Sequence, residues 1–276
     1  MTLNDLDKND HFVALFLGKQ GTGKDVAVAS LAKKYIEAKK KLLIWDIDQR
    51  ARGILGAADF LDKSILDNIE VDQDFDVGKG YAGLEKKLEL LLAYQNSGQV
   101  RYGGLVIDSA STMQKMLLFD SIRLKGQQDS SKGRIRGTVK FTSPDDYLYA
   151  SMAFQQFMYN GFKLLKMDVV MSGWIVDRWG KDKSEKNEYA ANVVLGSKML
   201  ATEKLAEEIP GCFDEVYVFG KEDTGISSRP LKYYVEFESD VAKTARPKLK
   251  NKGQVDLTNK NFIDVYTSLI NGTYKG

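Results

Sequence analysis

The residues best suited to do chemistry form a glycine-rich tract at residues 18–25, which reads GKQGTGKD. It matches the phosphate-binding pattern G-x-x-x-x-G-K at every position except the last, where serine or threonine is usual. Glycines let backbone N–H groups turn toward phosphate oxygens, and the lysine supplies a positive charge to the β- and γ-phosphates. The tract predicts a purine nucleoside triphosphate site, and an ordinary glycine-rich turn between a strand and a helix is the alternative.

We expect the whole tract and the residue after it to contact ATP: Gly18, Lys19, Gln20, Gly21, Thr22, Gly23, Lys24, Asp25 and Val26. Lys24 is expected to lie in a solvent-open loop. Asp25 stands where a hydroxyl residue usually holds Mg²⁺. A carboxylate is a good Mg²⁺ ligand, but it brings negative charge toward the phosphates. Two like charges about 4 Å apart repel by roughly 4 kcal/mol at an effective dielectric near 20. The tract therefore favours nucleotide binding over fast hydrolysis.

Three further aspartates close apolar runs that are typical of buried strands. Asp108 ends the run LVID, which is the usual position for the carboxylate that holds Mg²⁺ in phosphoryl-transfer sites. We therefore expect Asp25 and Asp108 to be the metal ligands. Asp46 and Asp48 close the run IWDID, and either could polarise an attacking water. A plain solvated strand end is the alternative for each of them.

Apolar runs alternate with helical patterns along the chain. The expected strands are 11–17, 41–48, 103–109, 168–174, 214–220 and 232–238, and the expected helices are 25–40, 81–96, 112–124, 144–164 and about 257–271. This alternation is typical of βαβ units and a mostly parallel sheet, and strands without polar alternation favour a sheet covered by helices on both faces. We expect one α/β nucleotide-binding domain over residues 1–276, with its core at about 10–250.

The composition excludes several other classes of site. The 276 residues carry a net charge of +2, with 43% hydrophobic and 28% charged residues, which is typical of a globular chain. Cys212 and His11 are the only cysteine and histidine, which excludes a disulfide framework, a Cys/His zinc site and a histidine-based triad. No apolar run reaches about 18 residues, and the N-terminus is polar and acidic. We expect a cytoplasmic protein with no membrane segment.

The chain resembles the RecA-like P-loop NTPase core, especially the single-domain RecA-like proteins that phages encode for recombination and single-strand annealing. The resemblance covers about residues 10–250 and rests on GKQGTGKD, LIWDID, GLVIDS, DVVMSGW and AKTARPKLKNK. It implies a DNA-dependent ATPase that uses Mg²⁺ and ATP, acts on single-stranded DNA in the host cytoplasm, and assembles into a homo-oligomeric filament or ring.

The resemblance also implies roles for individual residues. Asp48 would activate the attacking water and Asp108 would hold Mg²⁺. Lys243 and Arg246 would reach the γ-phosphate bound by a neighbouring subunit, with Lys248 and Lys250 as substitutes. The chain departs from the family at Asp25 and at Gly173–Trp174, where a polar γ-phosphate sensor is common. Both departures put turnover in doubt and leave the expected fold unchanged.

The family's DNA-binding loops correspond to residues 125–146 and 175–194. Both segments carry basic residues, interleaved with glycine in the first and with aromatic residues in the second. Basic groups pair with phosphates and aromatic rings stack on bases at about 1–3 kcal/mol each. Charged, solvated loops are the alternative, because acidic residues dilute both segments.

Two other functions remain open at this point. Lys19 and the DID tract at 46–48 also suggest the ParA/MinD partitioning ATPases, which carry an extra lysine in the phosphate loop. That resemblance does not account for the basic tract at 243–252. The other possibility is a catalytically silent P-loop scaffold protein in a phage or replication assembly.

Overall fold

The computed structural model describes residues 11–50, 52–75, 80–128, 144–181, 192–201, 203–227, 231–244, 246, 248–250 and 252–275. In this part of the chain, ten strands form one sheet in the order β10-β8-β7-β1-β5-β4-β2-β3, with β6 paired to β5 and β9 to β7. The strands are β1 (Val13–Gly18), β2 (Lys41–Asp46), β3 (Ile69–Asp72), β4 (Tyr102–Asp108), β5 (Asp168–Lys181), β6 (Asn192–Met199), β7 (Glu215–Asp223), β8 (Leu231–Glu236), β9 (Lys243–Thr244) and β10 (Gln254–Asp256).

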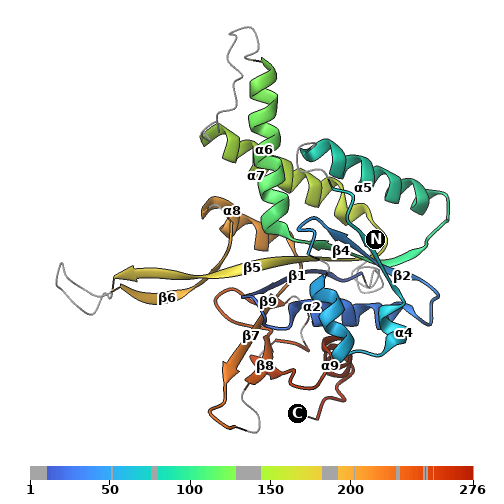
Figure 1. Ribbon diagram of the computed structural model, residues 1–276, viewed down its shortest axis with the longest axis vertical. Helices are drawn as coiled ribbons and strands as arrows, with labels where there is room; N and C mark the ends of the chain where they lie inside the picture. The colour runs from blue at the N-terminus through green and yellow to red at the C-terminus, as the bar shows by residue number, and fades with distance from the viewer. Residues whose placement is uncertain are drawn as a thin grey trace.

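Helices cover both faces of this sheet. Helices α5, α6 and α7 lie on one side, and α2, α4 and α9 lie on the other (Figure 1). The helical elements are α2 (Lys24–Ser30), η1 (Leu31–Tyr35), α3 (Arg52–Leu55), η2 (Gly56–Asp59), α4 (Lys63–Leu66), α5 (Gly80–Asn96), α6 (Ala110–Gln128), α7 (Pro144–Asn160), η5 (Phe162–Leu164), α8 (Glu203–Glu208), η6 (Ile209–Cys212) and α9 (Phe262–Asn271). None of the described helices is long and apolar enough to span a bilayer.

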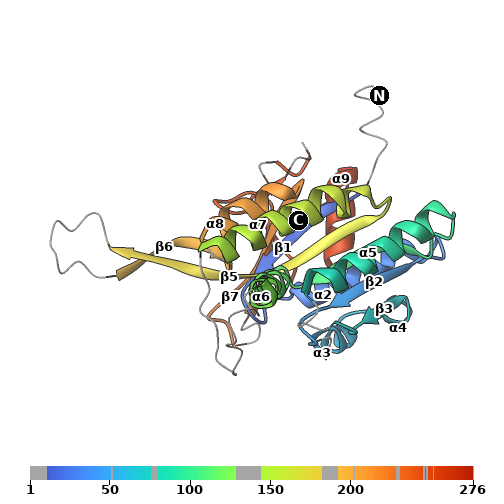
Figure 2. The same cartoon turned by 90° about the horizontal axis from the view of Figure 1, so that it is seen from above.

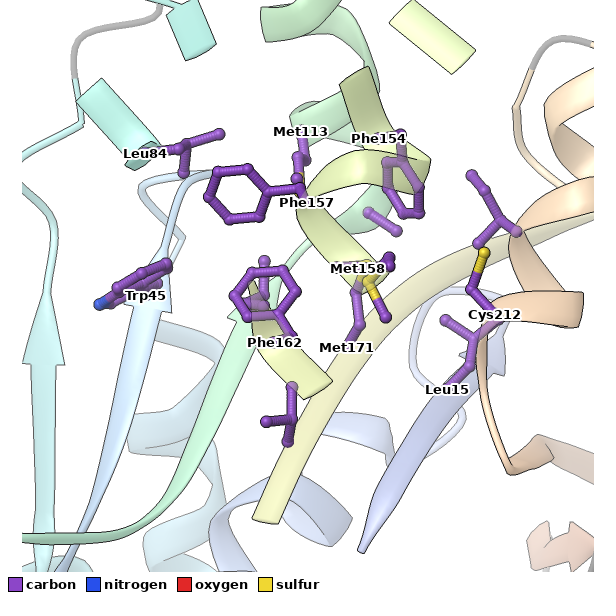
Figure 3. Close-up of a cluster of buried hydrophobic side chains, with 14 of the residues drawn as sticks. Leu15, Trp45, Leu84, Met113, Phe154, Phe157, Met158, Phe162, Met171 and Cys212 are labelled. Atoms are coloured by element: carbon purple, nitrogen blue, oxygen red, sulfur yellow. The ribbon is translucent and has the colours of Figure 1, made fainter. Parts of the chain in front are cut away.

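Strand β1 explains why the sheet needs cover on both sides. Its side chains alternate between two buried clusters: Leu15 and Leu17 pack toward α5, α6 and α7, whereas Ala14 and Phe16 pack toward α2 and α9. Figure 3 shows the first cluster, in which large aromatic side chains from α7 lie beside residues of the strands. The expected α/β class, with a mostly parallel sheet and helices on both faces, is confirmed.

Six neighbouring strands, from β3 through β2, β4, β5 and β1 to β7, run parallel, so their carboxyl ends meet at one edge of the sheet. In register, Gly18 at the end of β1 lies opposite Trp174 of β5 and Phe219 of β7. Asp46 of β2 lies opposite Asp108 of β4. This is the edge at which open parallel sheets bind ligands.

Several expected boundaries were wrong. The helix expected at 25–40 is α-helical only to Ser30 and continues as a 3₁₀ turn to Tyr35. The helix expected from about 257 begins at Phe262, because the Asn261 side chain accepts a hydrogen bond from the Asp264 N–H at 2.9 Å and caps it there.

The two segments expected as DNA-binding loops are partly regular structure. Residues 125–128 belong to α6 and 144–146 to α7, while 129–143 lie outside the described residues. Residues 175–181 and 192–194 belong to the antiparallel pair β5–β6, and 182–191 again lie outside. The β5–β6 ribbon projects from the body of the molecule in both views (Figures 1 and 2).

Candidate functional site

The glycine-rich tract forms the turn between β1 and α2. Gly21 and Gly23 have φ values of 69° and 86°, a left-handed conformation that side-chain-bearing residues rarely adopt. Thr22 fixes the turn from inside, because its hydroxyl donates to the Lys19 carbonyl at 2.8 Å. Gly21, Gly23 and Thr22 therefore suit the backbone conformation of this turn. The turn places backbone carbonyls around the Lys24 side chain.

Lys24 is buried, with 8% of its surface exposed, rather than open to solvent as the sequence suggested. Its ammonium group donates to the carbonyls of Gly18 at 2.9 Å and Lys19 at 3.1 Å. Burial lowers the pKa of Lys24, and the negative charges of Asp25 and Asp108 oppose this shift. The loop thus holds one cation at its centre, with carboxylates near enough to favour the charged form.

Asp108 lies beside this lysine and has an unusual titration. Burial raises the pKa of Asp108 to about 6, and the charges of Asp48, Asp25 and Asp46 add to the increase. A hydrogen bond from the Ser172 hydroxyl works in the opposite direction and lowers that pKa. Asp108 is thus a buried carboxylate whose negative charge is disfavoured by its neighbours, and a nearby divalent cation would stabilise that charge.

The two aspartates at the end of β2 differ in their surroundings. Asp46 is fully buried and accepts hydrogen bonds from the Arg50 N–H at 2.9 Å and from Gln73 Nε2 at 2.6 Å. Asp48 is partly exposed, and its carboxylate accepts a hydrogen bond from the Ser109 hydroxyl at 3.2 Å. Of the two, Asp48 is therefore the one in a position to meet a water molecule, and Asp46 shapes the turn that carries it.

A cavity of about 1350 Å³ opens over the phosphate loop. Its lining includes seven of the nine residues expected to bind the nucleotide: Gln20, Gly21, Thr22, Gly23, Lys24, Asp25 and Val26. Asp48 and Asp108 line the same cavity. Gly18 and Lys19 do not line it, and they contribute backbone carbonyls that hold Lys24. The volume exceeds the 300–1,000 Å³ that is typical of small-molecule pockets.

Other cavity residues were not expected at the nucleotide site, among them Ser172 and Tyr233, whereas Trp174 was expected at the position of the family's γ-phosphate sensor. Ser172 could have been noticed, because it is the polar residue that ends the apolar run DVVM and stands next to Gly173–Trp174. The position of Tyr233 depends on strand β8 folding back beside β7, where its ring faces Gly23. No local signal in the sequence indicates that contact.

Asp25 is exposed and its carboxylate lies against α3. A Cβ atom added to Gly53 would approach Asp25 Oδ2 to 2.4 Å, so the exposed carboxylate would have to shift to admit a larger residue there. Asp25 lines the cavity as well, and its charge acts on both Lys24 and Asp108. It is therefore available to a metal ion bound at the phosphates, and it packs close to Gly53 of α3.

Among the described residues, no group of three His, Cys, Asp or Glu side chains is arranged to hold a metal ion alone. Magnesium usually binds through one or two carboxylates together with substrate phosphates and water. Asp108 and Asp25 fit that requirement, because both carboxylates line the cavity beside Lys24. They would hold Mg²⁺ only together with a phosphorylated ligand.

Lys243 and Arg246 are not brought to this cavity within one chain. Lys243 belongs to β9, which pairs with the first residues of β7 at Glu215 and Val216. Gly18 of the phosphate loop lies opposite Phe219, further along the same strand. Arg246 pairs with the buried carboxylate of Glu215, whose pKa is raised to about 7 by burial. Lys248 donates to the Ile270 carbonyl at 2.6 Å.

Comparison with known proteins adds no family to this description. No protein-family model matches the chain, and no curated protein matches it either.

Proposed function

We propose that the chain is a RecA-like P-loop protein that binds Mg–ATP in the cavity over the phosphate loop. The observation that carries the proposal is the arrangement around Lys24. A glycine-rich turn holds this lysine at its centre, and Asp108 and Asp48 face the same cavity from neighbouring strands. A buried cation with carboxylates at one side is suited to a triphosphate that carries its own metal ion.

Metal binding is supported by the titration of Asp108. Its pKa of about 6 reflects burial and the repulsion of three nearby carboxylates, and a Mg²⁺ ion would relieve that repulsion. Ser172 donates a hydrogen bond to the same carboxylate and so orients it. We assign the metal to Asp108 and Asp25, and the activation of water to Asp48.

Turnover is proposed to be slow. The carboxylate of Asp25 adds negative charge beside the loop in which the transferring phosphoryl group would sit, and catalysis of phosphoryl transfer depends on stabilising negative charge there. The ring of Trp174 is an apolar neighbour of Lys24 at 4.9 Å, where the family has a polar sensor. Both features are expected to slow hydrolysis, and neither removes the phosphate loop that would bind the nucleotide.

The DNA partner is proposed from the β5–β6 ribbon and the sequence of its tip. The ribbon begins directly after Trp174 and extends the central strand β5 beyond the sheet. Arg178, Trp179 and Lys181 are part of its sequence. Such residues contact single-stranded DNA through phosphates and stacked bases. We propose that this ribbon contributes to single-strand binding in phage recombination or replication, in a homo-oligomer.

A nucleotide-binding scaffold without turnover is the second candidate, and Asp25 together with Trp174 favours it. The ParA/MinD alternative gains no support from Lys19, because the Lys19 ammonium pairs with Asp177 of its own chain at 2.6 Å and does not line the cavity.

The test is ATP hydrolysis with and without single-stranded DNA, measured alongside a nucleotide titration. We expect slow hydrolysis that single-stranded DNA accelerates, and loss of turnover without loss of binding in Asp48→Asn. Tight ATP binding with no hydrolysis under any condition would identify the scaffold. Stimulation by duplex DNA or membranes, with none by single-stranded DNA, would favour the partitioning ATPases.

A further inference from the structure

Trp174 is the residue of β5 that reaches the phosphate loop. It lies opposite Gly18 in the β1–β5 register, and its side chain lines the cavity. The centre of its ring is 4.9 Å from the Lys24 ammonium nitrogen. Its carbonyl accepts the Leu200 N–H at 2.7 Å, which fixes the backbone at the base of the β5–β6 ribbon.

The hydrogen bonds of Lys24 show what this contact does. A lysine ammonium has three N–H donors, and two of them are used by the carbonyls of Gly18 and Lys19. Trp174 faces the same ammonium group with its ring, as in a cation–π contact. For a desolvated cation such a contact corresponds to about 30-fold in a binding constant, or about 2 kcal/mol.

The position of Trp174 indicates which phosphate of a bound nucleotide would lie beside its indole. Strand β5 lies between β1 and β4, so Trp174, which lies opposite Gly18, stands between the phosphate loop and Asp108 at the end of β4. Asp108 would hold Mg²⁺ together with the phosphates, so the terminal phosphate would lie between the phosphate loop and Asp108, over the end of β5. The loop itself would enclose the β-phosphate, whereas the terminal phosphate would approach Lys24 from the side that the Trp174 indole covers.

On the basis of the proposed nucleotide site, we propose that Trp174 sets the preference of this site between nucleoside triphosphate and nucleoside diphosphate. The indole covers the side of Lys24 that the γ-phosphate needs, so a triphosphate must displace the ring before it is seated. The β-phosphate of a diphosphate reaches Lys24 from the loop side and leaves the indole in place. Trp174 therefore weakens ATP binding and leaves ADP binding nearly unchanged.

A second contact between the ribbon and the loop provides a matched control. Asp177 pairs with Lys19 at 2.6 Å, only three residues after Trp174. Lys19 does not line the cavity, so this pair ties the ribbon to the loop without covering the phosphate site. Asp177→Asn should therefore leave the ratio of ATP to ADP affinity unchanged.

The experiment is calorimetric titration of Mg–ATP and Mg–ADP into the full chain and into Trp174→Leu, Trp174→Phe and Asp177→Asn. Trp174→Leu is expected to bind ATP about 30-fold more tightly and ADP less than threefold more tightly, by the cation–π contact that it removes. Trp174→Phe keeps an aromatic face, so its ATP affinity should fall between those of the wild type and Trp174→Leu. An unchanged ATP/ADP ratio in Trp174→Leu, or weaker ATP binding, overturns the proposal.

A measurement without nucleotide separates this proposal from the proposed function. The acetylation rate of Lys24, followed by mass spectrometry, should rise severalfold in Trp174→Leu, while the exposed Lys33 reacts at the same rate in both proteins. Equal rates at Lys24 would show that the indole does not cover it, and would overturn the proposal even if ATP binds. A wild-type chain that binds neither nucleotide overturns the proposed function and the specificity role together.

Discussion

Asp25 is the residue at which binding and catalysis make opposite demands. Its negative charge is tolerated in the ground state because Mg²⁺ masks it, but negative charge spreads over the phosphoryl oxygens in the transition state. We predict that Asp25→Thr hydrolyses ATP at least severalfold faster, since each 1.4 kcal/mol or so changes the rate about tenfold. Steady-state turnover across a Mg²⁺ titration measures this. A slower threonine variant at saturating Mg²⁺ would mean that Asp25 is an effective metal ligand.

Asp108 gives a prediction on stability rather than rate. Its pKa is about 6 in the folded protein and 3.8 in an unperturbed chain. Between about pH 4 and 6 the folded protein keeps a proton that the unfolded chain has released, so stability falls as pH rises through this window. Asparagine has no such proton, and it can still accept the Ser172 hydroxyl.

We therefore expect Asp108→Asn to unfold at higher urea concentration than the wild type at pH 7.5. Its free energy of unfolding should be larger by about 1–3 kcal/mol. At pH 4 the two proteins should be nearly equal. The measurement is urea unfolding at both pH values without nucleotide. An equal difference at both would show that packing, and not the buried charge, separates the variants.

At the scale of elements, the pair Arg246–Glu215 joins the segment after β9 to the start of β7. Glu215 is only 3% exposed, so removal of the guanidinium leaves a buried carboxylate without its cation. We predict that Arg246→Ala loses about 2–3 kcal/mol of stability at pH 8, whereas Lys243→Ala, at an exposed position, changes it by less than about 0.5 kcal/mol.

Urea unfolding compares these variants, and Glu215→Gln in the Arg246→Ala background should restore part of the loss. If Arg246→Ala does not destabilise the chain, the pair with Glu215 contributes little to stability. Arg246 would then remain a candidate for contacting the γ-phosphate bound by a neighbouring subunit. If the predicted loss occurs, Lys243→Ala is the variant with which to test that interface, because its effect on turnover can be measured in a protein whose stability is expected to be unchanged.

The elements around the site could be predicted to different degrees. Strands β1, β2 and β4 were found because each is a run of buried apolar residues between turn signals, and the glycine pattern placed the loop at residues 18–25. Strand β3 was missed because it is short and only partly buried. The sequence predicts a loop after Trp174 because residues 175–181 are basic and polar, whereas in the structure they continue β5 and pair with β6.

The residues of the candidate site could be predicted where they lie in short sequence patterns with known chemical roles. Lys24 and Asp108 lie in local patterns with known chemical roles. Ser172, Trp174 and Tyr233 reach the cavity through strand order, since β5 lies between β1 and β4, and β8 folds back beside β7. That order is a property of the whole sheet, and no short stretch of sequence encodes it.

For the whole molecule, the sequence of residues 125–146 predicts a single-strand DNA contact. Arg134 and Arg136 are two of its basic residues and lie outside the described part of the chain. Reversing both charges should weaken single-strand binding and flatten its salt dependence, because fewer counterions are released. Fluorescence anisotropy of a labelled oligonucleotide at several salt concentrations measures both. Unchanged affinity with the same salt slope would assign DNA binding to another surface.

The central claim is that Lys24 holds the phosphates of a bound nucleotide, and calorimetric titration of Mg–ATP tests it most directly. Lys24→Ala is compared with Lys33→Ala, which removes the same group from an exposed position whose partner is Asp264. We predict one ATP per chain in the wild type and in Lys33→Ala, and at least tenfold weaker binding in Lys24→Ala with the fold retained. Equal affinity in all three folded proteins, or no binding by the wild type, would contradict the account.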